Sequence, residues 1–120
     1  MLNKLNELTE AAAEFYEVPL EKLRSPCREP ACTKPRHVCQ WIADNAGYKK
    51  SKIARYWRLD RSSVHYGVKI VSERIKTSPH ELAELKRFLA YAKTYFLKVK
   101  QPLTDFIIDK MAVTHEDELP

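Results

Sequence analysis

Apolar residues recur along this chain mostly three or four positions apart, which is the spacing of an α-helix. The first such stripe consists of Leu2, Leu5, Leu8, Ala12 and Phe15. Continued along the chain, the pattern predicts helices near residues 2–16, 20–24, 35–46, 50–57, 61–76, 80–98 and 102–112. Only two glycines occur, and Ala, Leu, Lys and Glu are frequent, which also favours helix. We therefore expect an all-α helical bundle.

Prolines interrupt this pattern before the third predicted helix. Pro19, Pro26, Pro30 and Pro35 cannot all lie inside one continuous helix, because proline lacks the N–H that a helix interior requires. The segment is therefore predicted to be a loop, and this loop carries Arg28.

The segment Lys52–Tyr66, KIARYWRLDRSSVHY, predicts two helices joined by a tight turn. Ile53 and Trp57 lie four residues apart and share a buried face, and Ala54 is small enough to let a partner helix approach. Such a pair of helices is typical of a helix-turn-helix.

The second helix of this pair is predicted to begin after Asp60, whose carboxylate can accept a hydrogen bond from the N–H of Ser62 or Ser63. Its first turn, which starts at Arg61, is polar and corresponds to the part of a recognition helix that enters the DNA major groove. The core face of the helix is predicted to consist of Val64, Val68, Ile70, Val71 and Ile75.

These residues resemble the C-terminal DNA-binding domain, domain IV, of the bacterial replication initiator DnaA. Its motif is approximately Ile-Gly-x-x-Phe-Gly-x-Arg-Asp-His-[Ser/Thr]-Thr-Val-x-x-[Ala/Gly]. The matching residues here are Ile53, Ala54, Trp57, Arg58, Leu59, Asp60, Arg61, Ser62, Ser63, Val64 and Gly67. The segments Ala11–Ser25 and Lys34–Ala46 are similar to the preceding helices of that domain, so the resemblance covers about residues 9–76. It implies a helix-turn-helix bundle of the Trp-repressor-like kind.

The resemblance also implies DNA-contacting residues. Asp60, Arg61 and Ser62 match the family residues that contact bases in the major groove, and Arg28 matches an arginine that enters the minor groove. Arg61 replaces a histidine of the family motif, and arginine favours a bidentate contact to guanine worth roughly 1–3 kcal/mol of discrimination. Two further departures are Asp44, where the family often has a lysine, and Arg58, which replaces the glycine of the turn.

The prolines around Arg28 fit two interpretations. A proline-stiffened arm with one arginine suits insertion into a minor groove, whereas an ordinary connector between helices explains the prolines equally well.

Positive charge is concentrated in the predicted DNA-binding segment. Residues 24–76 hold 13 Lys and Arg against 4 Asp and Glu, a net of +9, whereas the whole chain has a net charge of +5. Such a concentration attracts the phosphate backbone and predicts binding that weakens steeply with salt. The candidates for backbone contacts are Arg36, His37, Lys49, Lys50, Lys52, Arg55, Arg58, Ser63 and His65. For any single one of them, a solvated surface charge is an equally good interpretation.

We expect residues 1–76 to form the DNA-binding module and residues 77–120 a helical extension packed on it. Ser78 or Thr77 is predicted to cap the helix that contains Pro79 and Glu81. The apolar stripe of that helix consists of Leu82, Leu85, Phe88, Leu89, Ala92, Tyr95, Phe96 and Val99. The stripe is predicted to belong to the core. The alternative is a surface on the 80–99 helix for a homodimer or a replication or host protein. The last residues form an acidic tail.

Two other kinds of site were considered. Cys27, Cys32, His37 and Cys39 invite a zinc hypothesis, but the spacing Cys-x4-Cys-x4-His-x-Cys does not match the usual paired pattern, and reduced thiols are expected. Ser62, Ser63, Asp60 and His65 are residue types of hydrolases, but crowded on one helical turn they cannot form a nucleophile, base and orienting group. We expect no metal, no cofactor and no enzyme activity.

The expected function is sequence-specific binding of double-stranded DNA. The sequence has no Walker-type phosphate loop, no apolar stretch long enough for a membrane and no apolar leader. We therefore expect a cytoplasmic protein without ATPase activity or a small-molecule substrate. The stand-alone members of the family imply a regulator of replication or transcription, of the kind carried by phages and prophages.

Overall fold

The computed structural model describes the backbone of residues 2–96 and the side chains of residues 5–92. Its helices are α1 (Leu2–Phe15), α2 (Leu20–Arg24), α3 (Pro30–Asn45), α4 (Lys50–Trp57), α5 (Arg61–Thr77) and α6 (Pro79–Phe96). The described residues contain no strand, which confirms the all-α prediction. None of these helices has the length and apolar character needed to cross a membrane. The predicted helix at 102–112 and the acidic tail lie outside the described residues.

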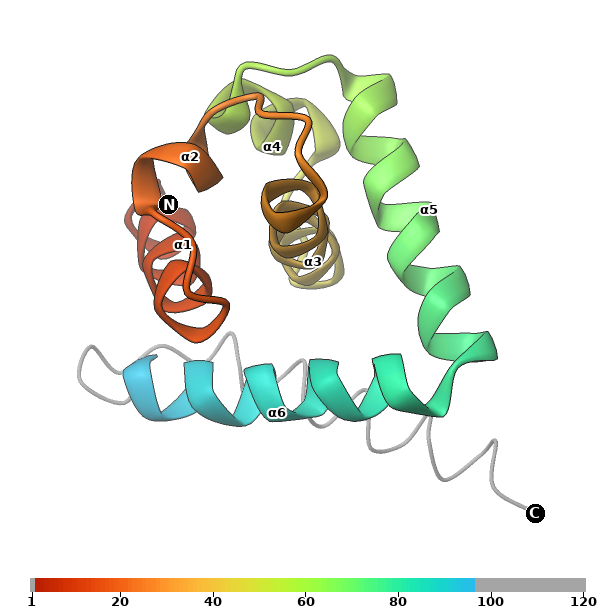
Figure 1. Cartoon of the computed structure of the whole chain (residues 1–120). Helices are drawn as coiled ribbons and strands as arrows, with labels where there is room; N and C mark the ends of the chain where they lie inside the picture. The colour runs from red at the N-terminus through yellow and green to blue at the C-terminus, as the bar shows by residue number, and fades with distance from the viewer. Residues whose placement is uncertain (1, 97–120) are drawn as a thin grey trace.

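Helix α3 lies at the centre of the fold. Figure 1 shows it nearly end-on, with α1, α4, α5 and α6 arranged around it. It packs against α1, α2, α4 and α5, and α6 closes the bundle by packing against α1 and α5. Because α3 is covered on several sides, its buried positions do not form a single stripe. They include Cys32, Val38, Cys39, Gln40, Trp41, Ile42 and Ala43.

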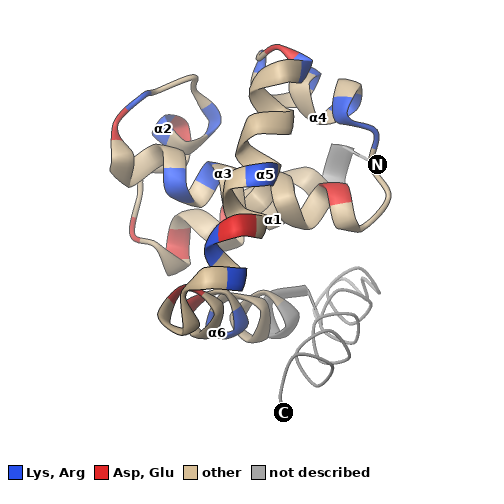
Figure 2. Ribbon diagram, turned by 90° about the vertical axis from the view of Figure 1, so that its right-hand side faces the viewer, with Lys and Arg blue, Asp and Glu red and all other residues tan. Residues whose placement is uncertain are grey.

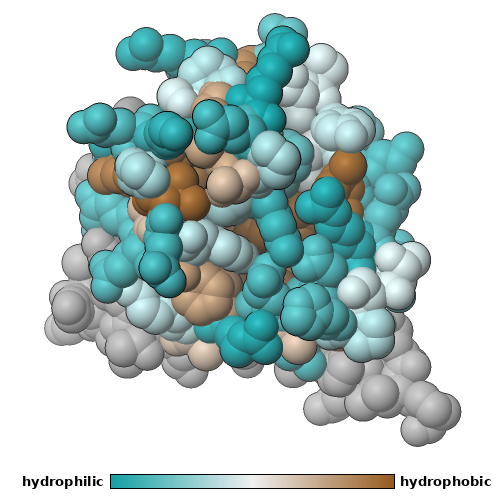
Figure 3. Space-filling view, viewed as in Figure 1, coloured by the Kyte–Doolittle hydropathy of each residue, from teal (hydrophilic) through white to brown (hydrophobic). Residues whose placement is uncertain are grey.

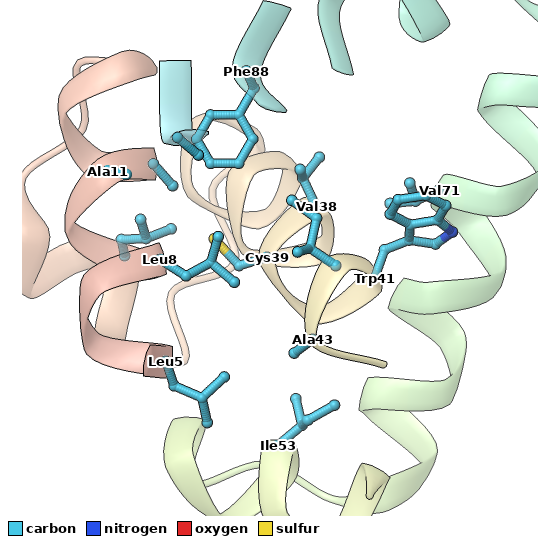
Figure 4. Close-up of a cluster of buried hydrophobic side chains, with 14 of the residues drawn as sticks. Leu5, Leu8, Ala11, Val38, Cys39, Trp41, Ala43, Ile53, Val71 and Phe88 are labelled. Carbon is cyan, nitrogen blue, oxygen red and sulfur yellow. The ribbon is translucent and has the colours of Figure 1, made fainter. Parts of the chain in front are cut away.

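The helices enclose one hydrophobic core. Figure 4 shows Leu5 and Leu8 of α1, Ile53 of α4, Val71 of α5 and Phe88 of α6 converging on α3. The buried part of the α6 stripe consists of Leu85, Phe88, Leu89 and Ala92. These four side chains belong to the core, as predicted for this part of the stripe, whereas Leu82 is only partly buried against it. The rest of the stripe beyond Ala92 lies outside the described side chains.

The predicted core face of α5 is largely confirmed. Val64 and Val71 are buried, and Val68 and Ile75 are partly buried against the core. Ile70 is the exception, since it is only partly buried and does not pack on the core cluster. The other four positions follow each other at intervals of three or four residues, whereas Ile70 falls outside that series and lies on the flank of the helix.

The start of α3 differs from the prediction. The helix begins at Pro30 rather than near residue 35, so Pro35 lies inside it. Pro30 is tolerated because the first helical position needs no N–H donor, and the N–H groups of Cys32 and Thr33 both donate to the Glu29 carbonyl at 2.9 Å. The ring of Pro35 is buried, which offsets part of the cost of an interior proline.

The predicted helix starts at Asp60 and Ser78 are confirmed in position. The Ser78 hydroxyl accepts a hydrogen bond from the N–H of Glu81 at 3.3 Å. Asp60 has the extended backbone of an N-cap, and its carbonyl accepts the N–H of Ser63 at 3.1 Å. The predicted bond from its carboxylate is wrong, because the exposed Asp60 side chain makes no capping hydrogen bond.

Three helices end with the same left-handed turn. Glu17, Gly47 and Arg58 have φ of 55°, 102° and 57°. After each of them the next N–H donates to a carbonyl five residues earlier: Val18 to Ala13 at 2.9 Å, Tyr48 to Ala43 at 3.1 Å, and Leu59 to Ala54 at 2.8 Å. The apolar side chain after each turn packs on the core. The turn at Arg58 therefore keeps the geometry of a glycine cap without glycine.

Helices α3 and α5 approach closely at Gly67. A Cβ at this position would lie 2.6 Å from Cδ2 of His37 and 2.7 Å from Oε1 of Gln40. Further along the same interface, Nε1 of Trp41 donates to the hydroxyl of Ser72 at 3.1 Å. The absence of a side chain at Gly67 thus sets how near the two helices can lie.

Replacing Arg58 by glycine should stabilise the protein. A left-handed conformation costs a non-glycine residue about 1–2 kcal/mol, and glycine's extra freedom in the unfolded chain costs about 0.4–1 kcal/mol. We expect Arg58→Gly to raise the free energy of unfolding in urea by about 0.5–1 kcal/mol. Arg58→Ala is the control, because it removes the same charge and keeps the strain. An equal gain in both variants would contradict the strain argument.

Replacing Gly67 by alanine should destabilise the protein although alanine is the better helix former. Overpacking typically costs about 1–3 kcal/mol, and the gain in helix propensity is about 1 kcal/mol. We expect Gly67→Ala to lower the free energy of unfolding by the difference, up to about 2 kcal/mol. Combining it with His37→Ala removes the ring that the new methyl group meets, so a double-mutant cycle should recover most of the loss. Additive effects would argue against this contact.

Candidate functional site

The start of α5 is held against the rest of the bundle by the end of α4. Trp57 is fully buried, and its Nε1 donates to the Leu23 carbonyl of α2 at 3.0 Å. Only three residues separate Trp57 from Arg61, the first residue of α5. Arg58, Asp60 and Arg61 are exposed on this connection. In Figure 3 the end of the molecule where α4 is followed by α5, at the top of the view, is mostly hydrophilic.

An open cleft lies between the α2–α3 connection, α3 and the start of α5. Its lining consists of Pro26, Arg28, Arg36, His37, Gln40, Leu59, Ser62, Ser63 and Tyr66. Five of these were predicted DNA contacts: Arg28, Arg36, His37, Ser62 and Ser63. Arg28 and Ser62 are more than thirty residues apart in the sequence, and the fold brings them to one cleft.

Arg36 is buried, although its charge predicted an exposed position that could contact phosphate. It is only 5% exposed, and its Nη1 donates to the Ser25 carbonyl at 2.8 Å. Burial lowers the pKa of Arg36, although an arginine keeps its charge in proteins. Its guanidinium therefore ties α3 to the connection that carries Arg28. This geometry does not favour the predicted phosphate contact.

His37 and Tyr66 face each other across the cleft. Their ring centroids are 6.1 Å apart and the rings are nearly perpendicular, at 82°. Burial lowers the pKa of His37 to about 4, helped by the positive charges of Arg36 and Arg74. His37 is therefore neutral near pH 7 and adds no positive charge to the cleft.

Gln40 and Tyr66 line the cleft without having been predicted. Gln40 is fully buried, and neither atom of its amide has a hydrogen-bond partner among the described residues. Tyr66 is the large hydrophobic residue most open to solvent in the described part, at 58%. A signal for Tyr66 exists in the sequence, since it lies two positions after Val64 and thus off the core face of α5. Gln40 gives no such signal.

A second cleft lies on the other side of the α5 start. It is lined by Asp44, Tyr48, Lys49, Lys50, Ser51 and Arg61. Nζ of Lys50 lies 3.0 Å from Oδ1 of Asp44, so the aspartate that departs from the family pattern takes up the charge of Lys50. Lys49 and Arg61 remain exposed beside this pair.

The remaining predicted contacts are exposed and line neither cleft: Lys52, Arg55, Arg58, Asp60 and His65. Figure 2 shows Lys and Arg on α4, on α5 and beside α2, with fewer Asp and Glu among them. The surface around the start of α5 therefore carries the positive charge that the sequence predicted for residues 24–76.

The zinc set considered from the sequence does not assemble. Cys39 is buried in the core on the side of Leu8 (Figure 4), and His37 faces Tyr66 in the cleft. A different group comes together instead: the ligand atoms of Cys27, Glu29 and Cys32 all lie within 4.8 Å of one another.

Comparison with known proteins adds no family. No protein-family model matches the chain, and a search of curated proteins finds no match. The resemblance to the DnaA domain is therefore carried only by the residues quoted for it.

The shifted pKa of His37 predicts a loss of stability in mild acid. The unfolded chain binds a proton at an imidazole pKa near 6.5, whereas the folded chain does so only near 4. Because the unfolded state binds the proton first, the stability from neutral His37 is present above pH 6.5 and is lost as the pH falls toward 4. We expect the melting temperature of His37→Gln to fall less between pH 7 and pH 4.5 than that of the wild type.

An exposed histidine, His65, provides the control for this measurement. His65→Gln should keep the full wild-type loss, because His65 lies in solvent on α5. Equal losses in wild type and His37→Gln would contradict the assignment to His37.

Proposed function

We propose that this protein binds double-stranded DNA in a sequence-specific manner, with α4 and α5 acting as a helix-turn-helix. The observation that carries the proposal is the cleft that joins Arg28 to Ser62 and Ser63. The resemblance assigns Arg28 to the minor groove and Ser62 to the major groove. If both contact the same DNA duplex, they must lie on the same face of the protein. Their common cleft supports this assignment.

In this proposal the first half of α5 enters the major groove. Its exposed residues are Arg61, Ser62, Ser63, His65 and Tyr66, whereas Val64 and Gly67 face the bundle. Asp60 and Arg61 contact base edges, and Ser62 and Ser63 contact bases or phosphate. The Asp60 carboxylate is not used to cap α5, so its oxygens are available to accept a hydrogen bond from a base amino group.

Basic side chains around this helix would contact the sugar-phosphate backbone. Lys49, Lys52, Arg55 and Arg58 are exposed and close in sequence to the start of α5. Lys50 is paired with Asp44 at the surface, with both side chains partly open to solvent. Surface pairs are typically worth about 0–1 kcal/mol, so a phosphate can compete for the lysine. Arg36 serves the interface by holding the connection of Arg28.

On the resemblance, the proposed protein is a cytoplasmic regulator of replication or transcription, of the kind carried by phages and prophages. The chain contains two glycines and no Walker-type loop, so binding would not be coupled to nucleotide hydrolysis by this sequence. We assign no catalytic role to the exposed Ser62, Ser63 and His65.

Arg61→Glu should abolish specific binding while leaving the fold intact. Loss of a bidentate arginine contact costs roughly 1–3 kcal/mol, and the new carboxylate repels phosphate. We expect the affinity for a duplex carrying a DnaA-type box to fall at least roughly tenfold relative to wild type, measured by fluorescence anisotropy at two salt concentrations. A scrambled duplex measures the part of the affinity that does not depend on sequence.

Arg87→Glu is the matched control, because Arg87 is an exposed arginine on α6 and the change in net charge is identical. It should keep the wild-type preference. Equal losses in both variants would indicate binding by net charge alone. If wild type prefers neither duplex but binds both with a steep salt dependence, a random-sequence selection identifies the target. No binding even at low salt would overturn the proposal.

A further inference from the structure

We propose that Cys27, Glu29 and Cys32 form a binding site for a thiophilic divalent metal ion such as Zn²⁺. Their ligand atoms lie within 4.8 Å of one another, and both cysteines are free thiols. Ligands at zinc distances of about 2.0–2.3 Å in a tetrahedron lie roughly 3.3–3.8 Å apart. A shift of about an ångström or less in each side chain therefore closes the three atoms around one ion.

The local backbone suits such a site. Cys27 and Glu29 lie on the α2–α3 connection, and Cys32 lies on the first turn of α3. Pro26 and Pro30 restrict the backbone on both sides of Cys27 and Glu29. The Cys-x4-Cys spacing of Cys27 and Cys32 lies within the range of structural zinc sites.

The three ligands are free to take up a metal. Glu29 is the N-cap residue of α3, yet its carboxylate makes no capping bond. Its ion pair with Lys22 is long, at 3.5 Å, and both side chains are more than half exposed, so it is weak. A metal binds the thiolate form of cysteine, so its binding to the two thiols would release protons.

The donor set selects the kind of ion. Two thiolates and one carboxylate suit Zn²⁺ and Co²⁺ and do not suit Mg²⁺ or Ca²⁺, which prefer oxygen ligands. Three protein ligands leave the fourth tetrahedral position for a water molecule.

A metal at this site would act on Arg28, which lies between two of the ligands in the sequence. Binding would fix the connection and hold the Arg28 side chain at the cleft. This consequence rests on the proposed DNA-binding function, whereas the metal site itself does not.

Titration of the reduced, metal-free full-length protein with Co²⁺ tests the site. We expect one Co²⁺ per chain, with thiolate-to-metal charge-transfer absorption and visible bands of tetrahedral cobalt, both removed by Zn²⁺. Cys27→Ser and Cys32→Ser should abolish the charge-transfer band, and Glu29→Gln should weaken binding roughly tenfold or more. Cys39→Ala is the control cysteine and should keep the wild-type spectrum, with folding of every variant confirmed by circular dichroism.

No charge-transfer band in the reduced wild type would overturn the proposal, as would a band that survives in Cys27→Ser and Cys32→Ser. Anisotropy with and without Zn²⁺ then measures the effect on DNA. Cobalt binding is measured without DNA. The metal site can therefore be tested even if the protein does not bind DNA, and DNA binding can be tested even if the protein does not bind metal.

Discussion

The close approach of α3 and α5 at Gly67 is the constraint on which the arrangement of this protein depends. Helix α3 packs against α1, α2, α4 and α5, so each of these four helices is positioned by how near it can come to α3. At Gly67 only a glycine leaves room for His37 and Gln40, and the Trp41–Ser72 hydrogen bond fixes a second point on the same axis. Two fixed points determine the direction of α5. They thereby place its first turn beside the α2–α3 connection.

At the connection between α4 and α5, a residue that lowers the stability of the fold adds a positive charge to the candidate site. A left-handed residue after α4 is required so that Leu59 can turn back onto the core, and glycine would adopt that conformation without strain. The chain has arginine instead, which costs stability and adds a positive charge next to the start of α5. Strained residues of this kind are found more often at functional sites. The burial of Trp57 and its bond to α2 over-determine the turn and allow it to persist.

Periodicity predicted most of the fold and only part of the site. The helices α1, α2, α4, α5 and α6 lie where the apolar spacing predicted them, because each has one face that must be buried. The start of α3 was missed because two prolines were interpreted as breaks, although one occupies the first helical position. Arg36 was predicted at the surface because a charged side chain is usually exposed. Its burial depends on the Ser25 carbonyl, which only the tertiary structure brings near.

The candidate site contains exposed residues that could contact DNA and buried residues that position them, and on α5 these are different residues. Along α5, Val64, Gly67 and Val71 are buried, and Val68 packs partly on the core. His65, Tyr66 and Lys69 between them are exposed, so these positions can change with little loss of packing. Arg28 is different, because its position depends on a short connection outside any helix. Arg36 anchors that connection at one end, and the first turn of α3 anchors it at the other. The position of Arg28 is therefore only as well defined as these two anchors make it. A ligand that ties the α2–α3 connection to α3 would fix the position of Arg28 further.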